Sequence, residues 1–217
     1  MEQKSIFSVI SPIMAGPSSS HTAGAVRLGL MARNIYHKPF KTVKFILYNS
    51  FATTGHGHGT DKGLLAGVLG YQVDDANIKN IYEIVNGVEY SYDYMQDISR
   101  HPNSVDIIFD DEMTISGNSI GAGEIRIVKI NGFSANIDGV YDTLIIMYKD
   151  KLGMISTVSE IIQKQRVNIA SLHCDRDSKG GNATMYVALD IPLGEGTVEK
   201  IRQIKDVFFV TNIRKLK

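Results

Sequence analysis

Residues 144–162 read LIIMYKDKLGMISTVSEII, and this stretch decides the fold of the C-terminal part of the chain. It opens with the apolar run 144–148, which is typical of a strand. A polar break that contains Gly153 follows, and apolar residues then recur at helical spacing at Ile155, Val158 and Ile162. The pattern predicts a strand that leads through a short turn into a helix.

The residues after this stretch continue the alternation of strands and helices. Strands are predicted at 168–174, 184–189 and 207–213, and a second helix around 198–204 precedes the last of them. The resulting order is βαββαβ, which is the ferredoxin-like arrangement. No low-complexity tract or internal repeat interrupts it.

The N-terminal part mixes helices with strands that follow one another directly. The patterning predicts helices over 23–34, after the glycine-rich stretch 55–61 and, more weakly, over 77–85, and strands at 42–48, 105–109, 113–116, 124–130 and 133–137. Asn131-Gly132 is a strong hairpin signal between the last two strands. We therefore expect an α+β protein, with a mixed α+β domain at residues 1–140 and a ferredoxin-like domain at residues 141–217.

The composition excludes several classes of function. The chain has 217 residues, of which 43% are hydrophobic and 21% charged, and its 23 basic and 23 acidic residues cancel. An excess of cations that would favour nucleic acid or an anionic membrane is absent, and we expect neither as a partner. No window reaches the roughly 18 apolar residues of a membrane span, and the first residues lack the apolar stretch of a signal peptide, so a cytoplasmic protein is expected.

The single cysteine, Cys174, limits the redox and metal chemistry of the chain. One thiol forms no internal disulfide, and it cannot supply the three or four thiolates of an iron–sulfur cluster. Cys174 and its neighbour His173 lie in a predicted strand, where a lone cysteine is usually a small buried hydrophobe. His37 and His101 lie in predicted turns, and we interpret all four residues as structural.

Residues 18–22, SSSHT, place several hydroxyl groups and free backbone N–H groups at the start of a predicted helix. Such an end favours a bound anion. The alternative is an ordinary N-cap, for which one serine suffices. His21 adds a group that exchanges protons near neutral pH, and a carboxylate bound beside a base suggests amino-acid or hydroxy-acid chemistry.

A second polar stretch, residues 55–61, reads GHGHGTD. His56 and His58 supply at most two metal ligands, whereas catalytic zinc usually has three, so we favour a substrate-contacting loop over a metal site. Thr60 and Asp61 have an alternative interpretation as caps of the following helix. Asp150 and the residues up to Gly153 form a further candidate for a ligand-binding turn at a helix N-terminus.

Three motifs together resemble those of the iron–sulfur-dependent bacterial L-serine dehydratases. They are GPSSSHTAG at residues 16–24, GHGTD at residues 57–61 and HPN at residues 101–103. The resemblance covers nearly the whole chain and points to the β subunit of the two-subunit form. The N-terminal part resembles the allosteric substrate-binding domain of certain phosphoglycerate dehydrogenases, and the part from about residue 142 onward resembles an ACT domain.

This resemblance implies an amino-acid lyase, linked to gluconeogenesis, that converts L-serine to pyruvate and ammonia without pyridoxal phosphate. A [4Fe-4S] cluster would be held by the cysteines of a separate α subunit, and this chain would hold no metal. By residue-by-residue comparison, His21 and His58 would transfer protons, with the identity of the base left open. The implied substrate-binding residues are Ser18, Ser19, Ser20, Thr22, Thr60 and Asp61.

The resemblance also implies roles in regulation and assembly. In the ACT-like domain, Asp150 and Gly153 match the ligand-side turn and Asn168 the start of the second strand, which makes them candidates for effector binding. A homodimer through this domain is expected. The family pattern often has a lysine or another residue at the position of His56, which we therefore interpret as a dispensable local variation. The alternatives are a purely regulatory amino-acid-binding subunit and, less favoured, a metal hydrolase that uses His56 and His58.

Overall fold

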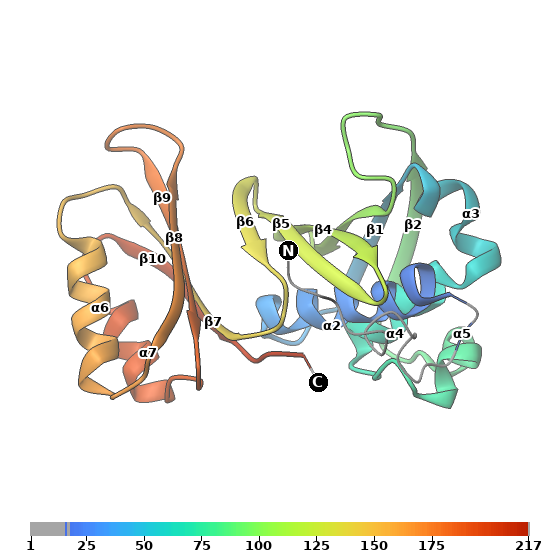
Figure 1. Ribbon diagram of the computed structural model, residues 1–217. Coiled ribbons are helices and arrows are strands. Elements are labelled where there is room, and N and C mark those ends of the chain that lie inside the picture. Colours follow the sequence, from blue (N-terminus) through green and yellow to red (C-terminus); the bar gives the residue numbers. More distant parts are fainter. Residues whose placement is uncertain (1–15, 17, 217) are drawn as a thin grey trace, which may run out of the picture. The chain divides into compact units, whose positions relative to one another are not determined.

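The computed structural model describes residue 16 and residues 18–216; Pro17 of the serine-rich motif lies outside the described residues. The chain divides into two compact units, residues 1–132 and 133–217 (Figure 1). Each unit is described by itself below. The domain limits of 1–140 and 141–217 remain a prediction.

The first unit combines a sheet with helices. Its helical elements are η1 (Ser19–Ala23), α2 (Gly24–Tyr36), α3 (Ser50–His58), α4 (Thr60–Leu69), η2 (Ala76–Asn80) and α5 (Ile81–Ile84). Its strands are β1 (Thr42–Tyr48), β2 (Glu89–Met95), β3 (Ser104–Phe109), β4 (Met113–Gly121) and β5 (Glu124–Ile130). The strands lie side by side in the order β2-β1-β3-β4-β5, with β1 and β2 parallel and the other pairs antiparallel.

Helix α2 packs on β4 and β5 and, along its other side, against α4. The two helices run parallel and touch through glycines. A Cβ atom on Gly29 would lie 2.5 Å from the Leu64 carbonyl oxygen, and one on Gly67 would lie 2.2 Å from the Val26 carbonyl oxygen. Only glycine permits backbones to approach this closely. Because the helices are parallel, their N-terminal ends lie at the same end of the pair, where Gly63 packs against the Thr22 carbonyl.

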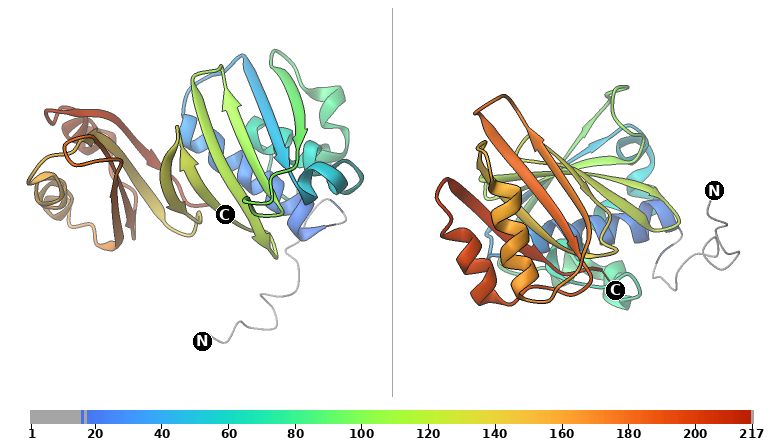
Figure 2. Two further views of the ribbon diagram at one scale, coloured as in Figure 1. Left: turned by 90° about the horizontal axis from the view of Figure 1, so that it is seen from above. Right: turned by 60° about the vertical axis from the view of Figure 1, so that its left-hand side comes forward.

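The second unit contains β6 (Phe133–Ile137), β7 (Asp142–Lys149), α6 (Met154–Lys164), β8 (Ile169–Arg176), β9 (Asn182–Leu189), α7 (Glu195–Arg202) and β10 (Val207–Ile213). Four of its strands form an antiparallel sheet in the order β10-β7-β9-β8. Helices α6 and α7 cover one face of this sheet (Figure 2). The predicted βαββαβ order and the α+β class are confirmed. Apolar residues of α6 one turn apart, Met154, Val158 and Ile162, are buried in the core of the unit.

Two sequence-based predictions were wrong in this fold. The stretch GHGHGTD is not a loop: α3 continues to His58, and α4 begins at Thr60 after Gly59, whose φ of 72° ends one helix and starts the next. Cys174 is exposed rather than buried, because it lies on β8 at the edge of its sheet. Its Sγ atom lies 2.9 Å from the Tyr148 hydroxyl.

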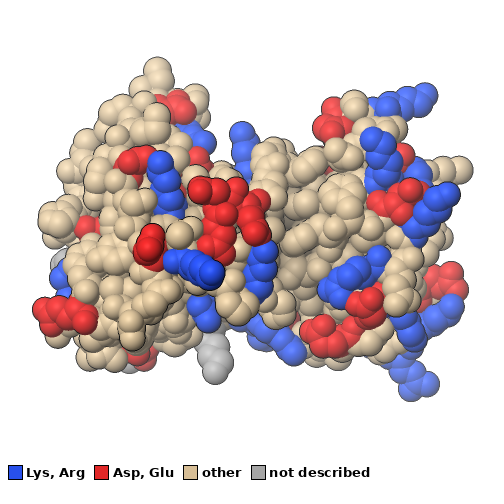
Figure 3. All heavy atoms as spheres, turned by 180° about the vertical axis from the view of Figure 1, so that it is seen from behind, with Lys and Arg blue, Asp and Glu red and all other residues tan. Residues whose placement is uncertain are grey.

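Charged side chains of both signs are interspersed on the face shown in Figure 3. This matches the equal numbers of acidic and basic residues in the chain. Within the described residues, no helix is long and apolar enough to cross a membrane.

The helix pair yields a prediction for stability. Gly67→Ala should lower the free energy of unfolding by about 1–3 kcal/mol, because the new methyl group meets backbone atoms that cannot move independently. Gly57→Ala is the matched control: it is also a helical glycine of this unit, but nothing lies within 4 Å of its Cβ position. Gly57→Ala should change stability by less than about 1 kcal/mol, in the stabilising direction. Urea unfolding of both variants, followed by circular dichroism, measures the difference; equal midpoints would contradict the close contact.

Candidate functional site

The two polar stretches of the sequence come together in the first unit. The Thr22 hydroxyl, which is buried, donates a hydrogen bond of 2.8 Å to the His58 carbonyl oxygen. The imidazole rings of His21 and His58 lie with their centroids 5.2 Å apart at an angle of 51°. The parallel packing of α2 and α4 explains this, since it places the segments that precede both helices at one end. The two candidate proton-transfer residues are therefore neighbours.

The serine-rich segment forms η1, a turn of π-helix, and π-helical turns occur frequently at functional sites. Ser18 caps this turn: its hydroxyl oxygen accepts the His21 N–H at 3.1 Å, and its carbonyl accepts the Thr22 N–H at 2.9 Å. The Ser119 hydroxyl donates to the Ser20 carbonyl at 2.8 Å and holds the turn from β4. Ser18 thus serves as the cap that one interpretation of the motif required.

Ser19 and Ser20 are half-buried. Within the part of the chain that the structure describes, their hydroxyl groups make no hydrogen bond. Each of these hydroxyls can therefore donate a hydrogen bond to a bound polar molecule and accept one from it.

His21 is held by the first turns of α3. Its Nε2 atom lies 3.0 Å from the Thr54 hydroxyl oxygen, and that hydroxyl donates its proton to the Ser50 carbonyl at 2.8 Å. A hydroxyl has a single proton, so in this network His21 donates from Nε2 to Thr54. The assignment of the tautomer follows from the hydrogen bonds and leaves Nδ1 as the acceptor nitrogen of the neutral ring.

The surroundings of His21 favour its neutral form. Burial lowers the pKa of His21 below its ordinary value of 6.5, and the nearby His58 lowers it further, while a hydrogen bond to the Ser50 backbone opposes the change. The unfolded chain therefore takes up this proton first as the pH falls through about 6.5, and His21 lowers stability on acidification in that window. At neutral pH the ring is available to accept a proton.

A cavity of about 230 Å³ adjoins these residues. The residues that line it include Thr22, His56 and His58 and two lysines, Lys62 and Lys79. His58 is exposed and is among the lining residues, whereas the half-buried His21 is not. The cationic lysines and the imidazoles give the cavity the character of a site for a small anion such as a carboxylate.

Asp61 contacts one of the residues that line this cavity, His56. Its side chain is only 3% exposed, and its Oδ2 atom lies 2.7 Å from Nδ1 of His56, whose side chain is 85% exposed. The sequence motifs predicted His56 to be a dispensable variation and gave no sign of its contact with Asp61. A histidine and an aspartate five residues apart were the only sign of this pair in the sequence. Their contact depends on the turn at Gly59, which the sequence pattern did not predict.

The N-cap of α4 is Gly59, so neither Thr60 nor Asp61 holds the N-cap position. The Asp61 carboxylate nevertheless accepts the Lys62 N–H of the first turn at 2.9 Å. Thr60 is fully buried, and its hydroxyl has no hydrogen-bond partner among the described residues. Such a group costs about 1–3 kcal/mol. Contact of Thr60 and Asp61 with a substrate stays a prediction.

The described residues do not fit an iron–sulfur cluster. Cys174 belongs to the second unit, where its thiol contacts Tyr148, and one thiol is too few for a cluster. Across residues 16 and 18–216, no group of three or more histidine, cysteine, aspartate or glutamate residues has the arrangement of a metal site.

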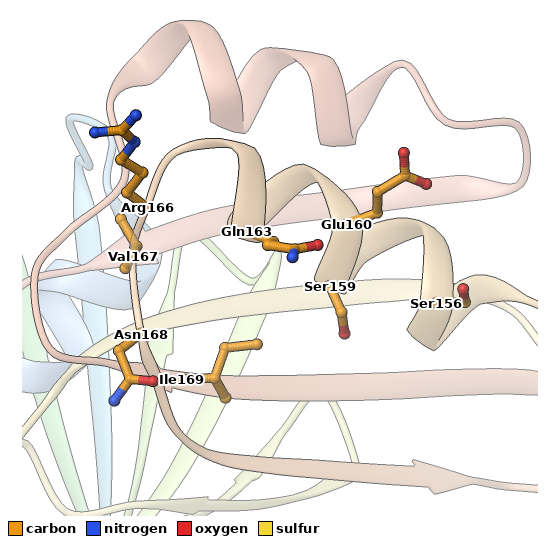
Figure 4. Close-up of a pocket in the computed structure, with 8 residues that line it drawn as sticks. All are labelled: Ser156, Ser159, Glu160, Gln163, Arg166, Val167, Asn168 and Ile169. Atoms are coloured by element: carbon orange, nitrogen blue, oxygen red, sulfur yellow. The ribbon is translucent and has the colours of Figure 1, made fainter.

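The three effector candidates of the second unit line two different cavities. Asp150 and Gly153 line one of about 720 Å³, in which the Asp150 carboxylate accepts hydrogen bonds from Arg176 and the Gly180 N–H, each at 3.0 Å. Asn168 lines another of about 750 Å³ along α6, shown in Figure 4. A single copy of the unit therefore does not gather the three residues around one ligand.

Comparison with known proteins shows the family. The model of the serine dehydratase beta chain matches residues 5–126. The chain is 39% identical over 202 residues to the L-serine dehydratase, beta chain, of Peptoniphilus asaccharolyticus, which covers 90% of this chain and 91% of that protein. It is 32% identical over 218 residues to the probable L-serine dehydratase, beta chain, of Bacillus subtilis, covering 98% and 99%. The chain belongs to the serine dehydratase beta chain family, as the motifs predicted.

A longer relative matches part of the chain. The L-serine dehydratase of Streptomyces coelicolor is 36% identical over 92 residues, which is 40% of this chain and 20% of that protein.

The histidine pair yields a prediction for titration. In an isotope-labelled chain, the NMR titration midpoint of His21 should lie below 6.5, and His58→Ala should raise it, because a neighbouring positive charge is removed. The rise should be incomplete, since burial is the larger cause. His37→Ala, at the exposed end of α2, should leave the midpoint unchanged. A midpoint in the native chain at or above 6.5 would refute this account of the site.

Proposed function

We propose that this chain is the β subunit of an iron–sulfur-dependent L-serine dehydratase, which converts L-serine to pyruvate and ammonia together with an α subunit. The observation that carries the proposal is the adjacency of His21 and His58 in a chain of this family. Their ring centroids lie 5.2 Å apart, and a cavity of about 230 Å³ adjoins them. Two relatives that match over most of their length are beta chains of L-serine dehydratases, which supports both the substrate and the existence of a partner subunit.

A longer relative supports the proposal that the activity needs a second subunit. The match to the L-serine dehydratase of Streptomyces coelicolor uses 40% of this chain and covers 20% of that protein, so most of that protein lies outside the match. We assign the missing part to the α subunit. Because Cys174 alone cannot ligate a [4Fe-4S] cluster, the cluster belongs to that subunit in this proposal, and no pyridoxal phosphate is needed.

The reaction requires a base near the α carbon of L-serine. Removal of the α proton leaves its electron pair to form the C=C bond while the C–O bond breaks and hydroxide departs. The resulting aminoacrylate tautomerises to an imine, and water hydrolyses the imine to pyruvate and ammonia. Each step is balanced without an oxidant or a reductant.

We assign the base to His58, because His58 is exposed and is among the residues that line the cavity, whereas His21 is not. His21, in ring contact behind it and with its Nε2 held by Thr54, is the positioning residue and stays neutral near pH 7. Ser19 and Ser20, whose hydroxyls make no hydrogen bond to described residues, would receive the substrate carboxylate or amine together with Ser18 and Thr22.

We also propose that the second unit binds an amino-acid effector and forms a homodimer. Asp150, Gly153 and Asn168 line separate cavities of one copy, so a shared ligand site would need a second copy. The edge strand β8, which is largely exposed, offers the surface for such pairing.

Reconstitution with the α subunit under anaerobic conditions tests the catalytic role. His58→Ala should lower kcat for L-serine by about 10²- to 10⁴-fold, the range for loss of a general base, while iron and sulfide contents stay unchanged. His37→Ala serves as the control and should retain full activity. A purely regulatory subunit would show the opposite pattern: full turnover in His58→Ala, with only the response to effectors altered. That result would refute the catalytic assignment.

A further inference from the structure

Asn49 joins the end of β1 to the start of α3 in an unusual backbone conformation. Its φ of 53° and ψ of −116° are those of the first central residue of a type II′ turn, a position that glycine usually occupies. Asn49 is the N-cap of α3, yet its side chain makes no capping hydrogen bond. Strain of this kind persists only where the surrounding structure fixes it, and it is frequent at functional sites.

The side chain of Asn49 instead binds the segment 96–103, which connects β2 to β3. Its Oδ1 accepts the Asp97 N–H at 2.8 Å, and its Nδ2 donates to the Asp97 carbonyl at 2.8 Å and to the Arg100 carbonyl at 3.3 Å. The His101 carbonyl lies 3.5 Å from the same nitrogen. An amide suits this place because it offers an acceptor and two donors at once. These bonds hold Asn49 in its strained conformation.

The segment 96–103 is itself fixed on the sheet. The Arg100 guanidinium donates to the buried Asp106 carboxylate at 2.8 Å, and its Cζ lies 3.9 Å from the centroid of the Tyr48 ring. The Tyr48 hydroxyl donates to the other oxygen of Asp106 at 2.9 Å. Asn49 therefore binds a partner that is anchored independently of it.

The backbone around Asn49 determines where α3 begins. The Asn49 N–H donates to the Met95 carbonyl at 3.0 Å, and the Phe51 N–H donates to the Pro102 carbonyl at 3.3 Å. The Asn49 carbonyl accepts the Thr53 N–H at 3.0 Å, the first helical bond of α3. Pro102 belongs to the motif HPN, which thus contributes to the position of this helix.

The first turns of α3 in turn hold His21. The Nε2 atom of His21 lies 3.0 Å from the Thr54 hydroxyl oxygen and 3.4 Å from that of Ser50. The imidazole also packs on the buried ring of Phe51, with the centroids 5.4 Å apart. All three residues follow Asn49 within five positions. A shift in the start of α3 would therefore displace every one of these contacts together.

We propose, resting on the function proposed above, that Asn49 is a positioning residue of the reaction. It fixes the start of α3 and so keeps the ring of His21 beside that of His58, the proposed base. Asn49 is not among the residues that line the cavity, and it acts through α3 alone. No bond or proton changes at Asn49 itself.

NMR of the isolated, isotope-labelled chain tests this role independently of activity. Asn49→Gly removes the side-chain hydrogen bonds, whereas glycine readily adopts the same backbone conformation. Nuclear Overhauser effects from the His21 ring to the rings of Phe51 and His58 should weaken. The titration midpoint of His21 should rise towards 6.5, because burial is the main cause of its lowered pKa and the ring becomes less buried.

Asn131→Gly is the matched control. Asn131 also has a positive φ, of 48°, and its side-chain oxygen accepts the Thr114 N–H at 2.8 Å. Thr114 lies near the start of β4, whereas Ser119, which binds η1, lies near its end. The control thus removes a comparable bond at a comparable backbone angle, and it should leave the signals of His21 unchanged.

Steady-state kinetics of the complex reconstituted with the α subunit give a second readout. Asn49→Gly should lower kcat for L-serine about 10- to 100-fold and change KM little, since a small misplacement of a catalytic group is enough for such a loss. Asn131→Gly should retain full activity. Asn49→Asp keeps the acceptor for the Asp97 N–H but loses both Nδ2 donors, so its kcat and its Overhauser effects should fall in the same direction.

The outcomes separate the two proposals. An inactive native complex, or a fully active His58→Ala variant, would refute the proposed function, while the Overhauser effects still report on Asn49. Folded Asn49→Gly and Asn49→Asp chains, checked by circular dichroism, that keep the native Overhauser effects or the native kcat would overturn the positioning role. Failure of both variants to fold would show that Asn49 serves the fold alone, and would overturn it as well.

Discussion

The glycine contact between α2 and α4 is the constraint on which the first unit depends. Where Gly29 and Gly67 meet, neither backbone leaves room for a Cβ atom. The helices therefore lie closer than ordinary side chains would permit, and they run parallel. Two parallel helices bring together the segments that lead into them, and both segments here are polar. The site is thus a consequence of how the helices pack, and it does not depend on any single polar bond.

This arrangement explains how the chain divides its chemistry. The Thr22 hydroxyl donates to the His58 carbonyl and so joins the serine-rich turn to α3, and the exposed His58 is one of the residues that line the cavity. His21 lies in a drier environment that favours its neutral form. Two imidazoles that could exchange protons therefore lie side by side here, and in the proposed function a cluster-bearing α subunit would supply the rest of the active site.

Periodicity predicted most of the fold, because burial repeats along the sequence with the period of each element. The strands β1 and β5 begin and end where the patterns placed them. Helix α6 buries Val158 and Ile162 as expected, whereas Ile155 is exposed and Met154 is buried in its place. The strand β2 was missed although Tyr90, Tyr92 and Tyr94 alternate with polar residues, because its low apolar content concealed the pattern. Local composition also suggested a loop at 55–61, where burial of Gly55 against Thr60 instead favours helix.

The candidate site was predicted in part. Motifs identified His21 and His58, whose proximity the structure shows, but the pairing of His56 with Asp61 depends on one glycine turn between two helices. Spacing alone does not reveal such a turn, because the same residues in a loop would point elsewhere. The exposure of Cys174 likewise depends on the order of the strands in the sheet. The residue pattern of one strand does not reveal that order.

The π-helical turn η1 also constrains how this chain can vary. A π turn holds one residue more than the α-helical turn that it replaces. Deleting one residue there would regularise the helix, yet it would rotate everything on the N-terminal side by about 100° around the helix axis. The serine-rich segment would then face away from His58. The π turn is therefore less stable than a regular helical turn, but it sets the direction of the His21 imidazole. Variants selected for stability alone would tend to lose the π turn.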